Sequence, residues 1–468
     1  MNETVNISVG PRIKRAVRAT LFRFQIRGVR FLEQRNGRAI IGDDMGLGKT
    51  MTALTWMAIH PELRPAVIIC PSSVKYHWQR ELWNHARIPS VVLSGQTPSR
   101  GMLYEDIVIL NYDILRFWSD TLKAFTPKVL VLDEFQRVKN RQAKRSRAST
   151  VLAQGMPHIL ALSGTPIISR PVEFFPVLQM IEPDEFKSFW AYAFRYCAPK
   201  RGFRGRGWDF SGASNTNELH QKVSKLMIRR MKSDVLADLP AKTRSVIPVD
   251  ISNRKEYEKA RDNFIQWLAS KKGNDAALRA SRAEAVVRLG ALKHLAAEGK
   301  IEDAIDSINE WMEDTDRKLV VFAIHHSIIN QLVEAFPSAA VVTGAVGTAE
   351  RSKAVDRFQL DPACRLFFGN MQAAGEGITL HAASDMLILE LGWTPAEHDQ
   401  TEDRINRIGQ TADHVHIRYM VAKNTVEEDV MALIDSKRDV VGQVIDGRSV
   451  STVQMTVIDR LLNGAKNV

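Results

Sequence analysis

Short apolar segments punctuate the first half of the chain, and polar or turn-forming residues follow each of them at once. An unbroken apolar run of four or five residues suits a strand that is covered on both faces. Helical patterns separate these runs, which is the order expected of a parallel sheet with helices on both sides. The predicted strands cover residues 66–70, 107–110, 129–132 and 159–162.

A second set of apolar runs in the last third of the chain predicts a second α/β unit. Residues 254–313, between the two sets, have apolar positions at helical intervals with breaks at Gly273 and Gly299, and they predict three helices of a connector. Residues 226–240 predict one more helix, which ends at Pro240. The expected fold class is therefore α/β, with two parallel sheets and a helical connector. The second set of predicted strands covers residues 319–324, 340–343, 365–369, 386–390 and 416–421, with helices at 327–336 and 349–358.

Length and charge narrow the class of protein. A chain of 468 residues, 45% of them hydrophobic, has room for two or more domains with cores of their own. The net charge of +11 favours a polyanionic partner such as nucleic acid, although general solubility also explains such an excess. The three cysteines lie too far apart for a metal site or disulfide framework. No apolar run approaches membrane length, and the N-terminus does not have the pattern of a signal peptide.

Residues 40–50 combine a short apolar run, a turn with glycines and the start of a helix. Glycines let a backbone approach phosphates closely, and the free amides of a helix N-terminus attract anions. Lys49 would then reach the outer phosphates of a nucleotide, and the Thr50 hydroxyl would bind Mg²⁺. Gly42 fits the usual P-loop spacing only if one extra residue is counted, so an ordinary turn and helix start is the alternative. The predicted nucleotide-binding loop comprises Asp44, Met45, Gly46, Leu47, Gly48, Lys49 and Thr50.

Asp133 and Glu134 directly follow a predicted buried strand. Ligands of open parallel sheets bind at the carboxyl ends of the strands. Asp133 is therefore placed to hold Mg²⁺, and Glu134 to accept a proton from an attacking water, whereas the simpler interpretation is an acidic turn. Gln25 could pair with an adenine edge through its amide, or could be an exposed helix glutamine.

Two basic runs suggest contacts with phosphates. Residues 137–147 contain Arg137, Lys139 and four further cations without an acid, and residues 195–206 contain five cations interleaved with Phe203 and glycines. Both runs would suit a DNA backbone, and both would also suit a solvated charged surface.

Arg404 and Arg407 lie three residues apart near the end of the second unit. On a helix they would share a face, with Gln400 one turn before Arg404. Two guanidinium groups could stabilise charge on a transferring phosphoryl group, as arginine fingers do, whereas the alternative is a surface helix held by salt bridges. A turn that includes Gly377 could offer amides to a phosphate or be a plain tight turn. Trp393 could wedge against nucleic acid or pack into a core.

Taken in order, these motifs resemble those of the Swi/Snf-type branch of the superfamily-two helicase-like ATPases. The closing Arg-Ile-Gly-Gln at 407–410 is specific to that branch, and the runs 71–78, 163–171 and 229–240 are most similar to the HARP-like annealing helicases. The resemblance covers about residues 20–440. It is carried by segments similar to the family's first motif, Walker B motif, third, fifth and sixth motifs, at residues 43–50, 133–134, 162–166, 373–380 and 400–410.

The resemblance implies two RecA-like lobes that close on ATP and Mg²⁺ and move along double-stranded DNA. It implies that Gln25 contacts adenine, that Lys49, Asp133 and Glu134 carry the chemistry, and that Arg404 and Arg407 complete the site from the other lobe. The DNA contacts and coupling residues expected from it are Ser72, Arg137, Lys139, Ser163, Thr165 and Trp393, and Gln136, Gln400 and Gln410 respectively. The expected domains are a loosely held basic lead-in at 1–20, an N-terminal lobe with a helical insertion at 21–240, a connector at 241–315, a C-terminal lobe at 316–440 and a tail at 441–468.

Two departures from the family's pattern stand out. Gln136 replaces the usual histidine of Asp-Glu-x-His, and because glutamine cannot carry a positive charge, coupling between hydrolysis and DNA would be altered. About 20 residues precede the motifs and about 60 follow them, so we expect a minimal motor without accessory modules, a monomer of bacterial or phage type in the cytoplasm, or in the nucleus if the source is eukaryotic.

Two other functions fit parts of the same pattern. An RNA-dependent or strand-separating helicase would use the same nucleotide motifs on another nucleic acid. A non-catalytic clamp would bind DNA under the control of ATP, but the presence of Lys49, Asp133, Glu134, Arg404 and Arg407 argues against a site without turnover.

Overall fold

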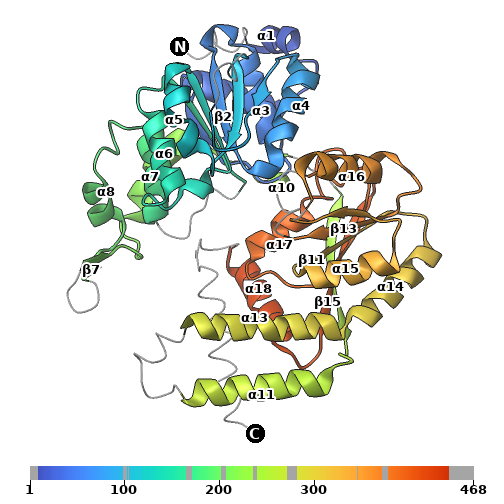
Figure 1. The fold of residues 1–468 in the computed structure, drawn as a ribbon. Helices are drawn as coiled ribbons and strands as arrows, with labels where there is room; N and C mark the ends of the chain where they lie inside the picture. Colours follow the sequence, from blue (N-terminus) through green and yellow to red (C-terminus); the bar gives the residue numbers. More distant parts are fainter. Residues whose placement is uncertain are drawn as a thin grey trace. The chain divides into compact units, whose positions relative to one another are not determined.

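A computed structural model shows two compact units, Met1–Asp238 and Leu239–Val468, each with its own parallel sheet (Figure 1). The α/β class and the two parallel sheets predicted from the sequence are confirmed. The structure describes residues 9–98, 103, 105–164, 171–201, 207–235, 240–270, 282–344, 346–371 and 378–441.

The described part of the first unit has a parallel sheet with the strand order β3-β4-β2-β5-β6-β1-β9. Its central strands are fully buried, which explains why they appear in the sequence as continuous apolar runs. The predicted run 66–70 coincides with β2, and the other three predicted runs differ from strands by one residue. The strands are β1 (Arg38–Ile41), β2 (Ala66–Cys70), β3 (Val91–Val92), β4 (Ile107–Asn111), β5 (Val129–Asp133), β6 (His158–Leu162) and β9 (Met227–Ile228).

Helices cover both faces of this sheet. In β2, Val67 and Ile69 pack into one core with α5 to α9, whereas Ile68 and Cys70 pack into another with α1 to α4. This alternation follows from the two-residue period of a strand. A short antiparallel pair, β7 (Lys200–Arg201) and β8 (Trp208–Asp209), lies beyond α8. The helices are α1 (Val9–Ala16), α2 (Arg23–Gln34), α3 (Lys49–Ala58), α4 (Lys75–Ala86), α5 (Leu115–Ala124), α6 (Lys144–Ala153), α7 (Pro171–Ile181), α8 (Phe189–Tyr196), α9 (Thr216–Leu226) and α10 (Lys232–Val235), with short 3-10 turns η2 (Pro61–Leu63), η3 (Ser72–Val74) and η4 (Phe135–Val138).

The described part of the second unit has a parallel sheet with the order β10-β15-β14-β11-β13-β12. Its two cores again lie on opposite faces, since Val320 and Phe322 of β11 join one core and Val321 joins the other. The strands are β10 (Ala241–Val249), β11 (Leu319–Ala323), β12 (Ala340–Val342), β13 (Leu366–Asn370), β14 (Asp385–Ile388) and β15 (His414–Ala422). The helices are α11 (Arg254–Ser270), α13 (Arg282–Gly299), α14 (Ile301–Asp314), α15 (His326–Ala335), α16 (Thr348–Leu360), α17 (Pro395–Glu402) and α18 (Val426–Val441).

Three sequence expectations differ from the structure. The lead-in is not loose over its described part, because α1 forms and Ile13 and Val17 are buried. The helix predicted at 226–240 is replaced at its start by β9, because Met227 and Ile228 pair with the open edge of β1. The sequence predicted no strand at β10, which is an edge strand with charged residues and Pro248 rather than an apolar run.

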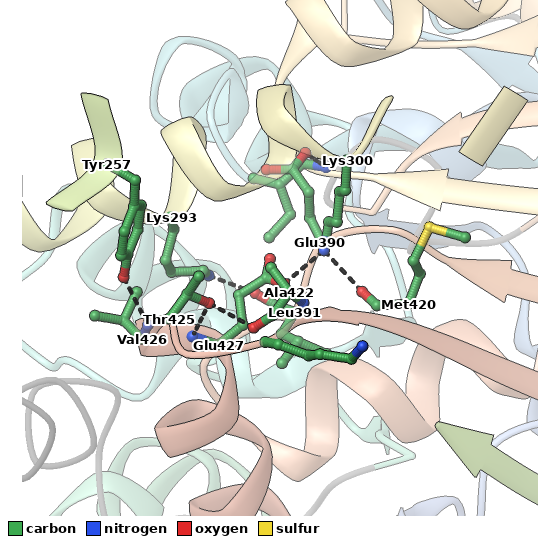
Figure 2. Close-up of polar contacts among 12 residues, drawn as sticks. Tyr257, Lys293, Lys300, Glu390, Leu391, Met420, Ala422, Thr425, Val426 and Glu427 are labelled. Atoms are coloured by element: carbon green, nitrogen blue, oxygen red, sulfur yellow. Dashed lines mark hydrogen bonds and ion pairs between the residues drawn. The ribbon is translucent and has the colours of Figure 1, made fainter. Parts of the chain in front are cut away.

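The helices predicted as a connector do form, but they pack on the second unit's sheet. A buried polar network holds them there (Figure 2). The Lys300 ammonium, between α13 and α14, lies 2.6 Å from the Glu427 carboxylate and donates to the Met420 carbonyl oxygen at 2.7 Å. The Tyr257 hydroxyl of α11 accepts a hydrogen bond from the Val426 amide at 2.8 Å. Within the described ranges, no helix has both the length and the apolar character of a membrane span.

Lys293 of α13 lies in the same network with its side chain buried. Its ammonium donates to the Leu391 carbonyl oxygen and lies 4.1 Å from the ring centroid of Trp393. Burial lowers the pKa of Lys293 to about 8, although nearby carboxylates such as Glu427 and Glu390 act in the opposite direction.

We expect Lys300→Met to destabilise the second unit by about 3–5 kcal/mol, because it leaves the buried Glu427 carboxylate without its partner cation. Urea unfolding of the full chain would measure the change. The double variant Lys300→Met/Glu427→Leu removes both charges and should recover much of the loss. A single variant as stable as the wild type would contradict this role of the pair.

The lowered pKa of Lys293 predicts an unusual alkaline trend. Below pH 8 the lysine is charged in both states, so the folded state carries the full cost of a buried charge. Between about pH 8 and 10.5 only the unfolded chain keeps the proton, so stability should rise with pH, by about 3 kcal/mol for this group. Lys293→Met should lack this rise in unfolding experiments across the interval, and equal slopes for the two proteins would refute it.

Candidate nucleotide-binding site

The loop between β1 and α3 has the strand, turn and helix predicted for a P-loop. Gly46 and Gly48 have φ angles of 81° and 73°, which side-chain-bearing residues rarely adopt. A Cβ on Gly48 would also lie 2.5 Å from the Gln25 Nε2 atom. Because Gly48 is the N-cap and α3 begins at Lys49, the first amides of the helix are directed toward the loop, where an anion would bind.

Lys49 folds back on its own loop. Its ammonium donates to the carbonyl oxygens of Asp43 and Asp44 at 3.0 and 3.2 Å. Burial lowers the pKa of Lys49, and the charges of Glu134 and Asp133 partly oppose this shift. The P-loop lysine and the acidic pair therefore lie within electrostatic range of each other. The carbonyl contacts are ones that a phosphate could replace.

The sheet register explains why this lysine and the acidic pair meet. Asp133, the last residue of β5, and Ile41, the last residue of β1, both pair with Leu162 of the intervening strand β6. The P-loop and the acidic pair therefore both lie at the carboxyl ends of their strands, at the same level of the sheet. Gly164, just past β6, is so close to Met45 and Lys49 that any side chain there would collide with Met45.

Asp133 is buried, and two aromatic side chains hold it in place. Trp78 Nε1 donates to Asp133 Oδ2 at 2.8 Å, and the Tyr112 hydroxyl donates to the Asp133 carbonyl oxygen at 2.8 Å. Burial, and then the neighbouring charge of Glu134, raise the pKa of Asp133 above its usual range. A cation would relieve both effects, so the carboxylates, together with the Thr50 hydroxyl of the P-loop, fit the hard oxygen donor set that Mg²⁺ takes.

Glu134 has a strained backbone, with φ at +53°. Such strain persists where the surroundings impose it, and it is common at functional sites. Gln136 Nε2 donates to Glu134 Oε2 at 2.6 Å, so the residue that replaces the family's histidine orients this carboxylate. Gln136 Oε1 is buried and accepts no hydrogen bond from the described residues.

Gln25 is a buried part of the site rather than an exposed helix residue. Its Nε2 donates to the Leu47 carbonyl oxygen at 3.2 Å, and its Oε1 accepts from the Phe22 amide at 3.0 Å. Gln25 therefore ties α2 to the P-loop. One amide hydrogen and one lone pair are left over from these two bonds, which is the pair of functions an adenine edge requires.

An ion pair that no local sequence pattern indicates fixes the start of the P-loop. Asp43 is fully buried, and the Arg230 guanidinium holds both of its oxygens, with Nε at 2.8 Å from Oδ1. Asp44 Oδ2 accepts a hydrogen bond from the Lys232 amide at 3.0 Å. The sequence signal was the doubled acid at 43–44 and the doubled arginine at 229–230, but nothing in the sequence joins residues 187 positions apart.

In the second unit, Arg404 and Arg407 are not on a helix as predicted, because α17 ends at Glu402. They nevertheless converge, since both donate to the Ile378 carbonyl oxygen, at 3.4 and 3.2 Å. Glu402 is not part of a surface salt bridge. It is fully buried and its carboxylate accepts hydrogen bonds from Arg244 and Tyr419, and these contacts fix the end of α17.

The cation contacts of Glu402 have an electrostatic consequence. Burial alone would raise its pKa, but the Arg244 and Lys242 cations outweigh burial and lower the pKa of Glu402 to about 2. The carboxylate therefore stays charged at any physiological pH, and the segment that carries both arginines is anchored to β10.

The other predicted residues are distributed as follows. Gln400 lies on α17, and Gln410 Nε2 donates to the Ala383 carbonyl oxygen at 2.7 Å, which gives Gln410 a role in holding its loop. Trp393 is half-buried against the second unit's core that contains Val320 and Phe322. Its ring faces Lys293, an arrangement that favours packing.

The predicted DNA contacts of the first unit differ in exposure. Ser163 is buried, Arg137 is half-buried, and Ser72 and Lys139 are exposed. Thr165 and Gly377 lie outside the described residues.

Comparison with known protein families agrees with this geometry. The model of the SNF2-related domain matches residues 24–295, more than half of the chain, and the model of the helicase conserved C-terminal domain matches residues 299–409. The chain belongs to the SNF2-related family. The resemblance stated from the sequence motifs is thus confirmed.

Individual relatives are identical to this chain at about one third of the aligned positions. The chain is 33% identical to the human "DNA annealing helicase and endonuclease ZRANB3" over 92% of this chain and 41% of that protein. It is 32% identical to a "SWI/SNF-related matrix-associated actin-dependent regulator of chromatin subfamily A-like protein 1" of Xenopus tropicalis, over 91% of this chain and 45% of that protein. The chain spans less than half the length of these two relatives. Both are from animals and lend no support to the predicted bacterial or phage source.

Among solved structures, the "Sulfolobus solfataricus SWI2/SNF2 ATPase core in complex with dsDNA" is similar, with a TM-score of 0.45 and 23% identity over 96% of this chain and 97% of that chain. Because this TM-score is below 0.5, the family assignment rests on the sequence matches and not on this structure.

The site geometry predicts a role for Trp78. Trp78→Phe removes the hydrogen bond that favours the charged form of Asp133, so the pKa of Asp133 should rise further. We expect the affinity of the site for Mg²⁺ to fall about tenfold and the acid limb of Mg²⁺ binding to move to higher pH. Trp118→Phe is the control, because it removes an indole hydrogen bond to the Gly95 carbonyl oxygen, away from Asp133. Identical pH profiles for wild type and Trp78→Phe would show that Asp133 needs no such support.

Proposed function

We propose that this protein is an ATPase that depends on DNA and moves along double-stranded DNA. The observation that carries the proposal is the convergence of Lys49, Asp133 and Glu134 at one edge of the first sheet, in a chain of the SNF2-related family. The basic charge of the chain and its exposed cations near η4 support DNA as the polyanion.

Each residue has a physical task in this mechanism. The amides at the start of α3 and the Lys49 ammonium bind the phosphates of ATP. Thr50 and Asp133 would hold Mg²⁺, which supplies neutralisation of charge that develops on the phosphates. Glu134, oriented by Gln136, positions the attacking water and accepts its proton. Asp43 and Arg230 keep the loop in the geometry that phosphate binding requires.

The second unit contributes the arginine pair. Arg404 and Arg407 are already brought together by one carbonyl oxygen, and Glu402 fixes the segment that carries them. We propose that these guanidinium groups approach the outer phosphate when ATP binds and stabilise the charge that spreads over it in the transition state. Release of the Ile378 carbonyl oxygen would accompany that step.

One relative is named a DNA annealing helicase, and annealing requires separated strands beside a duplex. We therefore propose forked or branched DNA as the physiological substrate. We propose that the protein acts as a monomer wherever the cell keeps its DNA, in the cytoplasm of a prokaryote or the nucleus of a eukaryote.

The test is hydrolysis of ATP with blunt duplex DNA, forked DNA, single strands or RNA. We expect low activity alone and an increase of tenfold or more with DNA that contains a duplex. The increase should fall steeply with salt, because phosphate contacts release counterions. Stimulation by RNA alone, or by no nucleic acid, would overturn the proposal.

Glu134→Gln should abolish turnover, with a loss of about 100-fold or more, and should leave ATP binding within about twofold of the wild type, because glutamine keeps the shape but cannot take a proton. Binding of a fluorescent ATP analogue and single-turnover hydrolysis would measure the two effects. Glu185→Gln, at an exposed acid that pairs with Lys222 and has no proposed role in binding ATP or DNA, is a matched control. Undiminished hydrolysis by Glu134→Gln would assign the proton acceptor to another group.

A further inference from the structure

The two basic runs of the first unit meet at one cluster of aromatic rings. Arg141, from the first run, lies with its guanidinium 3.9 Å from the ring centroid of Phe189. Arg201, from the second run, lies 4.3 Å from the ring centroid of Trp208. Between these two cations the rings are in contact, and we call them the aromatic cluster: Phe189, Trp190, Phe194, Trp208 and Phe210.

Two side chains of the aromatic cluster are far more exposed than the side chains of a hydrophobic core. Trp190 and Phe194 keep 54% and 45% of their surface exposed, and they lie on successive turns of α8 with ring centroids 6.3 Å apart. Exposed apolar patches of this kind mark interaction sites. The cluster lies on α8 and the β7–β8 hairpin, at the end of the first unit that is far from α3 (Figure 1).

The chemistry of the cluster selects its ligand. A guanidinium stacked on a ring is attracted to the ring face and still offers donors to phosphate oxygens. Lys200 beside Arg201 is exposed and adds a further cation. Arg195 is already paired with Glu218 at 2.5 Å, so among the residues that the structure describes we assign the positive charge beside the rings to Arg141, Lys200 and Arg201. Ring faces flanked by such cations are the arrangement that binds single-stranded nucleic acid, in which each base stacks on a ring and the backbone follows the positive charge.

A duplex cannot use these ring faces, because its bases are stacked on one another. We propose that the aromatic cluster binds the unpaired bases of single-stranded DNA. The inference adds a second DNA contact to the proposed function and rests on it only in taking DNA as the substrate. It would direct the motor to forks and other branched DNA, where an unpaired strand adjoins a duplex.

The experiment measures the affinity of the full chain for a fluorescent oligothymidine and for a blunt duplex of the same length, without nucleotide. Trp190→Ala/Phe194→Ala should bind the oligothymidine about tenfold or more weakly, since each lost stacking contact has an effect of that order. Its affinity for the duplex, and stimulation of its ATPase by the duplex, should stay within about twofold of the wild type. Trp190→Phe keeps a ring and should retain most of the affinity for the single strand.

Trp83→Ala is the matched control. Trp83 of α4 is 51% exposed and carries a stacked arginine, Arg87, at 5.1 Å, but it lies outside the cluster. It should bind both DNAs as the wild type does. Thermal unfolding would verify that the variants remain folded, which their exposed positions favour.

Two results would overturn the inference. The first is unchanged affinity of Trp190→Ala/Phe194→Ala for the oligothymidine, which would point to a protein partner for the cluster. The second is an equal loss for both DNAs, which would reduce the cluster to a general phosphate site. Failure of the proposed function would be separate, because it would appear as a wild-type ATPase that no DNA stimulates, whatever the single-strand affinity.

Discussion

The site depends on one electrostatic arrangement at the edge of the first sheet. Asp133 is buried at the end of β5 beside a second carboxylate, and burial and like charge both disfavour its ionised form. The Lys49 ammonium, also costly to bury, lies within range of the same carboxylates. Each charge is tolerated because the others are present, and the remaining negative charge suits a bound metal. The P-loop supplies Lys49 to this group of charges, and the Trp78 indole donates a hydrogen bond to the Asp133 carboxylate within it.

The main elements of this arrangement could be predicted from the sequence because strands buried on both faces appear as continuous apolar runs. The run at 129–132 predicted β5, and the polar residues after it were expected at a sheet edge, where the structure has them. The prediction failed at β10, whose exposed edge carries charged side chains and Pro248. It also failed for Arg404 and Arg407, because their convergence is produced by a turn and the Ile378 carbonyl oxygen rather than by helical spacing.

The contacts that the sequence could not predict are those between distant segments. The buried ion pair between Arg230 and Asp43 joins residues 187 positions apart in the sequence, and no local pattern specifies it. The same holds for Lys300 and Glu427, which attach the predicted connector helices to the second sheet (Figure 2). In both cases a buried charge needs a partner, but the fold alone determines which one.

We propose two kinds of DNA contact on the first unit. Cations near η4 suit a phosphate backbone, whereas the aromatic cluster offers faces to bases that are not paired. Separate contacts for duplex and single strand would let the first unit distinguish a fork from plain duplex. Gln136 holds Glu134 where the family usually has histidine, so the carboxylate that we propose as proton acceptor is oriented here by a side chain that does not titrate.

We propose that the first unit binds ATP with Mg²⁺ through Lys49 and Asp133, at the carboxyl ends of its strands. Calorimetric titration of ATP, with Mg²⁺ and after its removal by EDTA, would compare the wild type with Asp133→Asn. Mg²⁺ should strengthen ATP binding to the wild type by about tenfold or more, and Asp133→Asn should lose this gain. An equal effect of Mg²⁺ on both proteins would contradict it.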